Sequence, residues 1–291
     1  MQKVLIIGGN GMLGHKLVQV LSSEFEVYAT LRRPLSDYEQ FERFSASKTF
    51  DCVDLMETGP IDGVLRELKP KVVINAAGII KQVPSAGNVI ETLTINSILP
   101  HRLAALSIEL GFRLVTIGTD CVFSGAKGNY SEDDISDAAD LYGKSKNLGE
   151  VTDGNCLTFR TSIIGRELGT KHGLLEWFLQ NRGGKVKGYS KAIFSGFPTI
   201  VFSRIIGDIL VNHPNLSGLY HVSSDPISKL DLLRLIDDRF RTNVEIEPSE
   251  NVRIDRSLNS ERFRRAAGFR PPPWREMIDQ LGEDSDGFDA K

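Results

Sequence analysis

The chain has 291 residues, 41% hydrophobic and 25% charged, a composition that suits one large globular α/β domain or two smaller lobes. Its formal net charge of -3 indicates neither a nucleic-acid nor a membrane partner, and no apolar run approaches the roughly 20 residues that cross a bilayer. Three widely spaced cysteines and five scattered histidines suggest neither a disulfide framework nor a metal site, so we expect no metal and a reducing, cytoplasmic compartment.

A glycine-rich turn follows the first predicted strand. Residues 4–7 are a continuous aliphatic run typical of a buried parallel strand, and glycines then recur at three-residue spacing before an amphipathic helix. Such glycines permit a tight turn, let a pyrophosphate approach the backbone and let the helix pack on the sheet. The alternative is a turn without a ligand, because the spacing differs from the G-x-G-x-x-G fingerprint. We expect the cofactor contacts of this segment at Gly8, Asn10, Gly11, Met12, Leu13 and Gly14.

Two arginines follow the second predicted strand, residues 26–30. In dinucleotide-binding folds this point faces the adenosine ribose, where an acidic residue binds the 2′-OH and an arginine accommodates a 2′-phosphate. Arg32 and Arg33 therefore favour NADP(H) as the cofactor, with NAD(H) left open. The alternative is a solvated basic turn.

Three further strands alternate with helices as far as residue 118. We expect strands at 50–53, 71–75 and 113–118 and helices at 60–69 and 91–110, which gives a doubly wound parallel α/β sheet of the Rossmann type. Ligands of such sheets bind beyond the carboxyl ends of the strands. Asn96 is polar on an apolar helical stripe and either bonds to buried backbone or is partly exposed. We assign the cofactor contacts of this region to Asp54, Leu55, Ala76, Ala77, Gly78 and Asn96.

A predicted helix over residues 141–150 carries two residues with catalytic potential. Tyr142 and Lys146 are four residues apart and lie on one helical face, which the preceding fifth strand directs toward the cofactor. Reduction of a carbonyl needs a proton donor, and a neighbouring ammonium together with an oxidised nicotinamide would favour the ionised form of a tyrosine. Thr119, just beyond the fifth strand, would orient the carbonyl oxygen. We also assign Tyr142 and Lys146 to cofactor binding, with Lys146 as a ribose ligand. A surface pair on a polar helix is the alternative for these two residues.

The regular alternation ends after Gly165. We expect a dinucleotide-binding domain at 1–165 and a smaller irregular substrate lobe at 166–282, with 195–215 returning to the first domain and a disordered tail at 283–291. Aromatic and arginine side chains in the lobe suit a base ring and a diphosphate. We assign substrate contacts to Asp120, Cys121, Thr161, Ser162, Trp177, Phe197 and Arg262.

The motifs GGNGMLG (8–14), NAAG (75–78) and YGKSK (142–146) resemble those of extended short-chain dehydrogenases/reductases. TDCVFSG (119–125), FRTSIIG (159–165) and FPT (197–199) are similar to those of the dTDP-4-dehydrorhamnose reductase branch, and the resemblance extends to about Leu281. It implies NADPH- or NADH-dependent reduction of a 4-keto group on a nucleotide-linked deoxysugar, in the synthesis of surface polysaccharide precursors. Thr119, Tyr142 and Lys146 would be the catalytic trio, and a homodimer is left open.

Two departures from the branch and two alternatives bear on this expectation. Cys121 stands where the branch usually has tyrosine, and Ile163 stands where it often has tryptophan. A related nucleotide sugar, such as an N-acetylated UDP-hexose, therefore competes with the dTDP-sugar as substrate. An epimerase or dehydratase of the same superfamily is one alternative activity. A non-catalytic regulatory subunit, like the β subunit of methionine adenosyltransferase, is the other.

Overall fold

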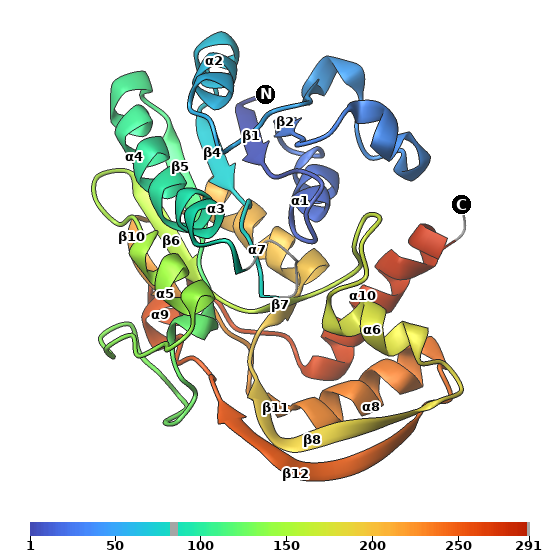
Figure 1. Cartoon of the computed structure of the whole chain (residues 1–291). Coiled ribbons are helices and arrows are strands. Elements are labelled where there is room, and N and C mark those ends of the chain that lie inside the picture. The colour runs from blue at the N-terminus through green and yellow to red at the C-terminus, as the bar shows by residue number, and fades with distance from the viewer. Residues whose placement is uncertain (82–86, 290–291) are drawn as a thin grey trace. The chain divides into compact units, whose positions relative to one another are not determined.

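The computed structural model describes residues 1–81 and 87–289 and divides them into two compact units, coloured along the chain in Figure 1. Unit 1 comprises Met1–Gly118, Ala139–Phe159 and Ser203–Leu219, and unit 2 comprises Thr119–Ala138, Arg160–Phe202 and Tyr220–Lys291.

A seven-stranded sheet confirms the predicted doubly wound α/β fold. Its strand order is β10-β6-β5-β4-β1-β2-β3, and every pairing from β3 to β6 is parallel. The order reverses between β1 and β4, the point at which ligands bind in such sheets. The strands are β1 (Lys3–Ile7), β2 (Glu26–Thr30), β3 (Thr49–Phe50), β4 (Val72–Asn75), β5 (Arg113–Ile117), β6 (Cys156–Arg160) and β10 (Gly218–His221).

Helices cover both faces of this sheet. On one face, a Cβ on Gly207 of α7 would lie 3.2 Å from Leu21 of α1, so these two helices pack together. On the other face lie α2 and α4. The helical segments are α1 (Gly14–Leu21), η1 (Leu35–Phe41), η2 (Ala46–Lys48), α2 (Gly59–Leu68), α3 (Val89–Leu93), the π-helix η4 (Thr94–Ile98), α4 (Leu99–Leu110), α5 (Leu141–Leu148) and α7 (Thr199–Asn212), of which the last spans both units.

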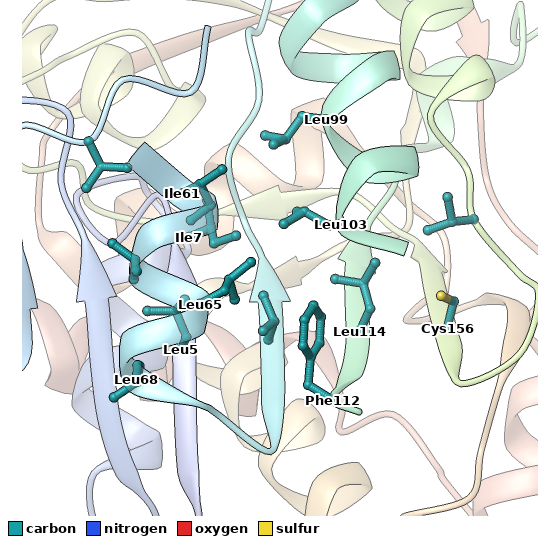
Figure 2. Close-up of a cluster of buried hydrophobic side chains, with 14 residues drawn as sticks. Leu5, Ile7, Ile61, Leu65, Leu68, Leu99, Leu103, Phe112, Leu114 and Cys156 are labelled. Atoms are coloured by element: carbon teal, nitrogen blue, oxygen red, sulfur yellow. The ribbon is translucent and has the colours of Figure 1, made fainter. Parts of the chain in front are cut away.

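The hydrophobic core beneath α2 and α4 follows from the alternation of side chains along the strands. Leu5 and Ile7 point to the same face of β1 and meet Leu65 of α2, while Leu103 of α4 packs beside Leu114 of β5, as Figure 2 shows. All five side chains are completely buried. This core fixes the strands at whose carboxyl ends the glycine turn and the segment after β4 begin.

Unit 2 is built around a three-stranded sheet of order β11-β8-β12. The strand β12 was not predicted, because its glutamates and proline resemble a polar loop; it nevertheless pairs in parallel with β8 through nearly its whole length. Ion pairs from Lys185 to Glu245 and Glu247, at 3.1 and 2.7 Å, cross the two strands. The other elements are η5 (Asp120–Val122), β7 (Ile163–Ile164), α6 (Leu174–Gln180), β8 (Lys185–Phe194), β9 (Phe197–Pro198), β11 (Ile227–Ser228), α8 (Lys229–Phe240), β12 (Glu245–Asp255), α9 (Glu261–Ala267) and α10 (Trp274–Asp289).

The unit boundaries and the C-terminus differ from the expected limits. Thr119–Ala138 and residues 160–165, which we placed in the domain 1–165, belong to unit 2, and Ser203–Leu219 rather than 195–215 belongs to unit 1. The expected tail 283–291 is helical as far as Asp289, and residues 290–291 lie outside the described residues. Ser285 is still buried in this part of the helix, and its hydroxyl donates to the Leu281 carbonyl at 2.7 Å.

Candidate functional site

The glycine turn between β1 and α1 is a close-packed cradle. Gly8 has φ +81°, and a Cβ on it would lie 3.0 Å from the Ala77 backbone. A Cβ on Gly14 would lie 2.1 Å from the Gly8 carbonyl oxygen, which no side chain tolerates. A Cβ on Gly11 would meet only that oxygen, at 3.3 Å. Gly8 and Gly14 are therefore required by packing, whereas the backbone at Gly11 has open space on one side.

The remaining predicted residues of the turn have different surroundings. Asn10 and Met12 are half-buried, and Leu13 is buried at the start of α1. A residue that the sequence did not single out, Thr30, holds the turn in place: its hydroxyl accepts from the Gly8 N–H at 3.2 Å, and its carbonyl accepts from the next N–H at 2.9 Å. A threonine at the end of β2 was the only signal for this role.

The two arginines after β2 differ from each other. Arg32 lies 3.6 Å from the Glu91 carboxylate, with its own side chain 69% exposed. Arg33 is exposed and makes no ion pair within the described part of the chain. An exposed ion pair contributes little, so neither guanidinium is firmly committed within the chain. After β3, Asp54 is exposed and accepts from the Met56 N–H at 2.9 Å, whereas Leu55 packs against the core.

The sequence is compatible with a buried or a partly exposed Asn96, and the structure shows that Asn96 is buried and hydrogen-bonds to backbone groups. Its Oδ1 accepts from the Ile79 N–H at 2.8 Å, and its Nδ2 donates to the Ile79 carbonyl at 2.9 Å and to Ser145 Oγ at 3.1 Å. Asn96 thus fastens the segment after β4, which contains Ala76 and Gly78, to helix α5. Its polar groups act within the protein.

Helix α5 begins at a well-formed cap. Asp140 accepts from the Gly143 N–H at 2.9 Å and pairs with Lys81 at 2.7 Å. The Lys81 ammonium lies 5.6 Å from the centre of the Tyr142 ring, which is half-buried. Tyr142 and Lys146 occupy one face of α5, as the spacing predicts.

Lys146 is a buried basic group with a strongly lowered pKa. Its Nζ is buried and donates to the Ile117 carbonyl at the end of β5, 2.7 Å away. Burial lowers the pKa of Lys146 to about 8, and the negative charge of Glu150 opposes this shift. A Cβ on Gly78 would lie 3.9 Å from this nitrogen. The ammonium therefore lies beside the small-residue segment that borders the glycine turn.

The π-helix η4 positions α5, and this support was not predicted. Gly149 follows α5, and a Cβ on it would lie 1.9 Å from the Asn96 carbonyl oxygen. Ser97 donates to the Ser145 carbonyl and His101 bonds to the Leu148 carbonyl, both at 2.7 Å. π-Helical turns often occur at functional sites. The contacts hold the tyrosine and lysine helix rigidly against η4 and α4.

In unit 2, three consecutive predicted residues form a polar turn. The Thr119 hydroxyl donates to Asp120 Oδ1 at 3.3 Å and accepts from the Cys121 N–H at 3.1 Å. Burial raises the pKa of Asp120, with the charges of Arg256 and Lys229 opposing this rise. Thr119 and Asp120 are buried, whereas Cys121 is half-buried.

Two of the predicted substrate residues have packing roles. Phe197 is completely buried and contacts the rings of Phe202 and Phe269, so its side chain cannot be the expected substrate contact. Its N–H donates to the Ser162 carbonyl at 2.9 Å. Thr161 is buried, and its carbonyl accepts from the Asp120 N–H at 3.2 Å. The segment at 161–162 therefore supports the Thr119 turn through its backbone.

The other two predicted residues lie at the surface of unit 2. Trp177 on α6 is 40% exposed. Arg262 donates to both carboxylate oxygens of Asp133 at 2.8 Å, and Glu132 lies 3.8 Å from it. An anion that binds Arg262 would have to compete with these carboxylates.

A buried histidine supports the loop that follows Thr119. His221 Nδ1 bonds to the Tyr130 carbonyl at 2.9 Å, and Nε2 lies 3.2 Å from the Arg160 guanidinium. Burial lowers the pKa of His221 to about 3, and the Arg160 charge adds to this effect. His221 is therefore neutral near pH 7, with Nδ1–H as donor and Nε2 as acceptor. No motif in the sequence indicates this cluster.

Residues 1–81 and 87–289 contain no group of three or more histidine, cysteine or acidic residues that would hold a metal ion. None of the helices in this part of the chain is both long and apolar enough to traverse a bilayer.

The fold and the residues around Lys146 define an α/β protein of the short-chain dehydrogenase/reductase type, with a glycine cradle and a Y-x-x-x-K helix. The chain belongs to the family described as RmlD substrate binding domain, whose profile matches residues 1–286. This confirms the resemblance to dTDP-4-dehydrorhamnose reductases drawn from the motifs.

Relatives and solved structures agree with this assignment. A spore coat polysaccharide biosynthesis protein, SpsK, of Bacillus subtilis (strain 168) is 28% identical over 96% of both chains. A dTDP-4-dehydrorhamnose reductase of Aggregatibacter actinomycetemcomitans is 27% identical over 78% of this chain and 74% of its own. A hypothetical dTDP-4-dehydrorhamnose reductase from Sulfolobus tokodaii superimposes with a TM-score of 0.77 at 26% identity, covering 94% of this chain and 98% of its own.

A second kind of protein also matches. Methionine adenosyltransferase 2 subunit beta of Xenopus laevis is 23% identical over 80% of this chain and 70% of its own. The relatives of this chain therefore include both a reductase and a subunit of another enzyme.

Proposed function

We propose that the chain is an NADPH-dependent reductase of a 4-keto group on a nucleotide-linked deoxysugar, with NADH as a second cofactor. The buried Lys146 ammonium is the observation that carries this proposal. It donates to the Ile117 carbonyl and lies beside Gly78, and Lys146 is one helical turn from Tyr142 on α5. A buried charge is costly, and a lysine with a lowered pKa is typical of a reaction centre.

The glycine cradle fits the diphosphate of a dinucleotide. The turn is kept compact by Gly8 and Gly14, and the open side of Gly11 leaves the backbone accessible. The N-terminus of α1, whose first turn holds no acidic residue, adds a favourable dipole. Arg33, exposed and without an ion pair among the described residues, suits the 2′-phosphate of NADP(H). When bound, the reduced nicotinamide supplies the hydride.

The residues of the chain would handle the proton and the substrate oxygen. Tyr142 donates its phenolic proton to the oxygen of the reduced carbonyl. The Lys146 ammonium stabilises the phenolate that remains, and its hydrogen bond to Ile117 fixes its position. Thr119 orients the substrate oxygen through its hydroxyl, which must turn away from Asp120 to do so.

Unit 2 supplies the remaining substrate contacts in this proposal. Asp120 and Cys121 follow Thr119, and Trp177 offers an exposed ring for a base. The cysteine in place of tyrosine, and Ile163 in place of tryptophan, leave the sugar open between a dTDP-deoxysugar and an N-acetylated UDP-hexose. The name of the Bacillus relative favours a role in polysaccharide precursor synthesis.

A screen of nucleotide 4-ketosugars with NADPH tests the proposal. Oxidation of NADPH is followed by absorbance, and the stereochemistry of the product distinguishes reduction from epimerisation. Tyr142→Phe keeps the ring and removes the acid, so turnover of the accepted substrate should fall about 10²–10⁴-fold with cofactor binding retained. Near wild-type turnover by this variant would contradict the role of α5.

A regulatory-subunit function is the second candidate, and it is favoured by the similarity to methionine adenosyltransferase 2 subunit beta. It predicts NADP(H) binding without turnover of any sugar nucleotide in the screen. Retention of Thr119, Tyr142 and Lys146 is the observation that ranks it second.

A further inference from the structure

A basic hollow of about 530 Å³ lies in unit 2, at the carboxyl end of α8. Its volume is within the range of small-molecule sites. Four arginines line it together with two aspartates, so positive charge is in excess. The charged residues are Arg182, Arg239, Arg241 and Arg275, with Asp238 and Asp279.

Two of these arginines are held next to each other by the backbone. The Gly183 N–H donates to the Thr242 carbonyl at 2.9 Å, and Arg182 and Arg241 are the residues immediately before this pair. Arg241 has φ +49°, a left-handed conformation that disfavours a side chain. Adjacent like charges on a strained backbone are unfavourable unless something compensates them.

The carboxylates in the described part of unit 2 do not compensate them. Neither Arg182 nor Arg241 makes an ion pair among the described residues. Asp237 is occupied: its carboxylate accepts from the Thr242 hydroxyl and from the Val244 N–H. The nearby Asp238 pairs with Arg275 at 3.1 Å, with both side chains about two-thirds exposed.

Favourable interaction with a helix end explains only part of the cluster. Cations near the carboxyl end of α8 are stabilised by the helix dipole, which accounts for Arg239 and Arg241. Arg182, in the turn after α6, and Arg275, on α10, come from other elements and line the same hollow. Convergence of guanidinium groups from three elements is typical of phosphate recognition.

We infer that this hollow binds a small ligand with at least two phosphate charges, a diphosphate group being the best fit. The site is separate from the Thr119 turn. Lys229, at the opposite end of α8, is the residue whose charge acts on Asp120. The 12 residues of α8 span about 17 Å, so the hollow lies roughly that far along the helix from Lys229. The inference does not depend on the proposed reductase activity.

The test is calorimetric titration of the full chain, without cofactor and at low salt, with inorganic pyrophosphate and in parallel with dTDP. Arg182→Gln/Arg241→Gln removes the two unpaired guanidinium groups from exposed positions, and circular dichroism checks that the variant is folded. The matched control is Arg234→Gln/Arg265→Gln, which removes the same charge from exposed arginines of unit 2 that pair within their own helices.

We expect pyrophosphate to bind the wild type and the control equally and the double variant at least about tenfold more weakly. Equal binding by all three proteins, or no binding by the wild type, overturns the inference. If the double variant does not fold, Arg241→Gln alone replaces it under the same criterion. If dTDP binds the double variant with unchanged affinity, its site lies elsewhere. If the substitutions weaken the binding of dTDP as well as that of pyrophosphate, the hollow accepts a nucleoside diphosphate.

Discussion

Lys146 should make the free energy of unfolding of the cofactor-free protein rise with pH, and the substitution Lys146→Met should remove this contribution. Its pKa is about 8 in the folded chain because the ammonium is buried, against 10.5 for an exposed lysine. The unfolded chain therefore binds more protons between these two values, and the free energy of unfolding rises with pH across this window. The full shift corresponds to about 3 kcal/mol, and about 2.5 kcal/mol of it falls between about pH 7 and pH 10.

Lys146→Met keeps much of the side-chain volume and removes the titrating group. We expect the difference in unfolding free energy between wild type and Lys146→Met to change by about 2.5 kcal/mol, in favour of the wild type, as pH rises from about 7 to 10. Other groups titrate in both proteins and cancel in the difference. The absolute difference at pH 7 is less informative, because the variant also leaves the Ile117 carbonyl without its donor.

Urea denaturation at a series of pH values measures this difference. Lys144→Met is the matched control, since Lys144 lies on the same helix but is exposed. Its curve should run parallel to that of the wild type. Parallel curves for wild type and Lys146→Met would refute the reasoning, because they would mean that the buried ammonium has an ordinary pKa.

Three further predictions concern packing and charge elsewhere. Gly14→Ala places a Cβ 2.1 Å from the Gly8 oxygen, so calorimetry should show NADPH affinity reduced at least about tenfold. Gly149→Ala places one 1.9 Å from the Asn96 oxygen, so kcat should fall with little change in NADPH affinity, as steady-state kinetics would show. The lowered pKa of His221, about 3, means that stability is lost as pH falls below about 6.5, and His221→Gln should lessen this loss in acid denaturation.

The sheet was predictable because its strands are short aliphatic runs separated by helical periodicity. Residues 4–7 and 113–116 are buried on both faces, so their sequence carries no alternation that would suggest another class. The glycine turn and the tyrosine and lysine helix were equally visible, since each requires particular residues at fixed spacing. Features that depend on a few residues at fixed spacing can be recognised from the sequence alone.

The remaining features depend on contacts between distant segments. The π-helix Thr94–Ile98 differs from an α-helix in hydrogen-bond register rather than composition, so only its packing against α5 reveals it. β12 forms because it pairs with β8, against its own polar composition. Phe197 was assigned to the substrate from its motif, but aromatic rings at other positions enclose it.

The position of Lys146 explains why α5 is supported so heavily. An ammonium that is buried and still charged near neutral pH destabilises its own surroundings by about 3 kcal/mol, so the helix that carries it would move toward solvent if it were free to do so. Hydrogen bonds from Ser97 and Asn96 to Ser145, and the close contact at Gly149, oppose that movement. In the proposed reaction the residues of η4 therefore do not need to contact the substrate. Their role is to hold the charge of Lys146 at the position where the reaction uses it.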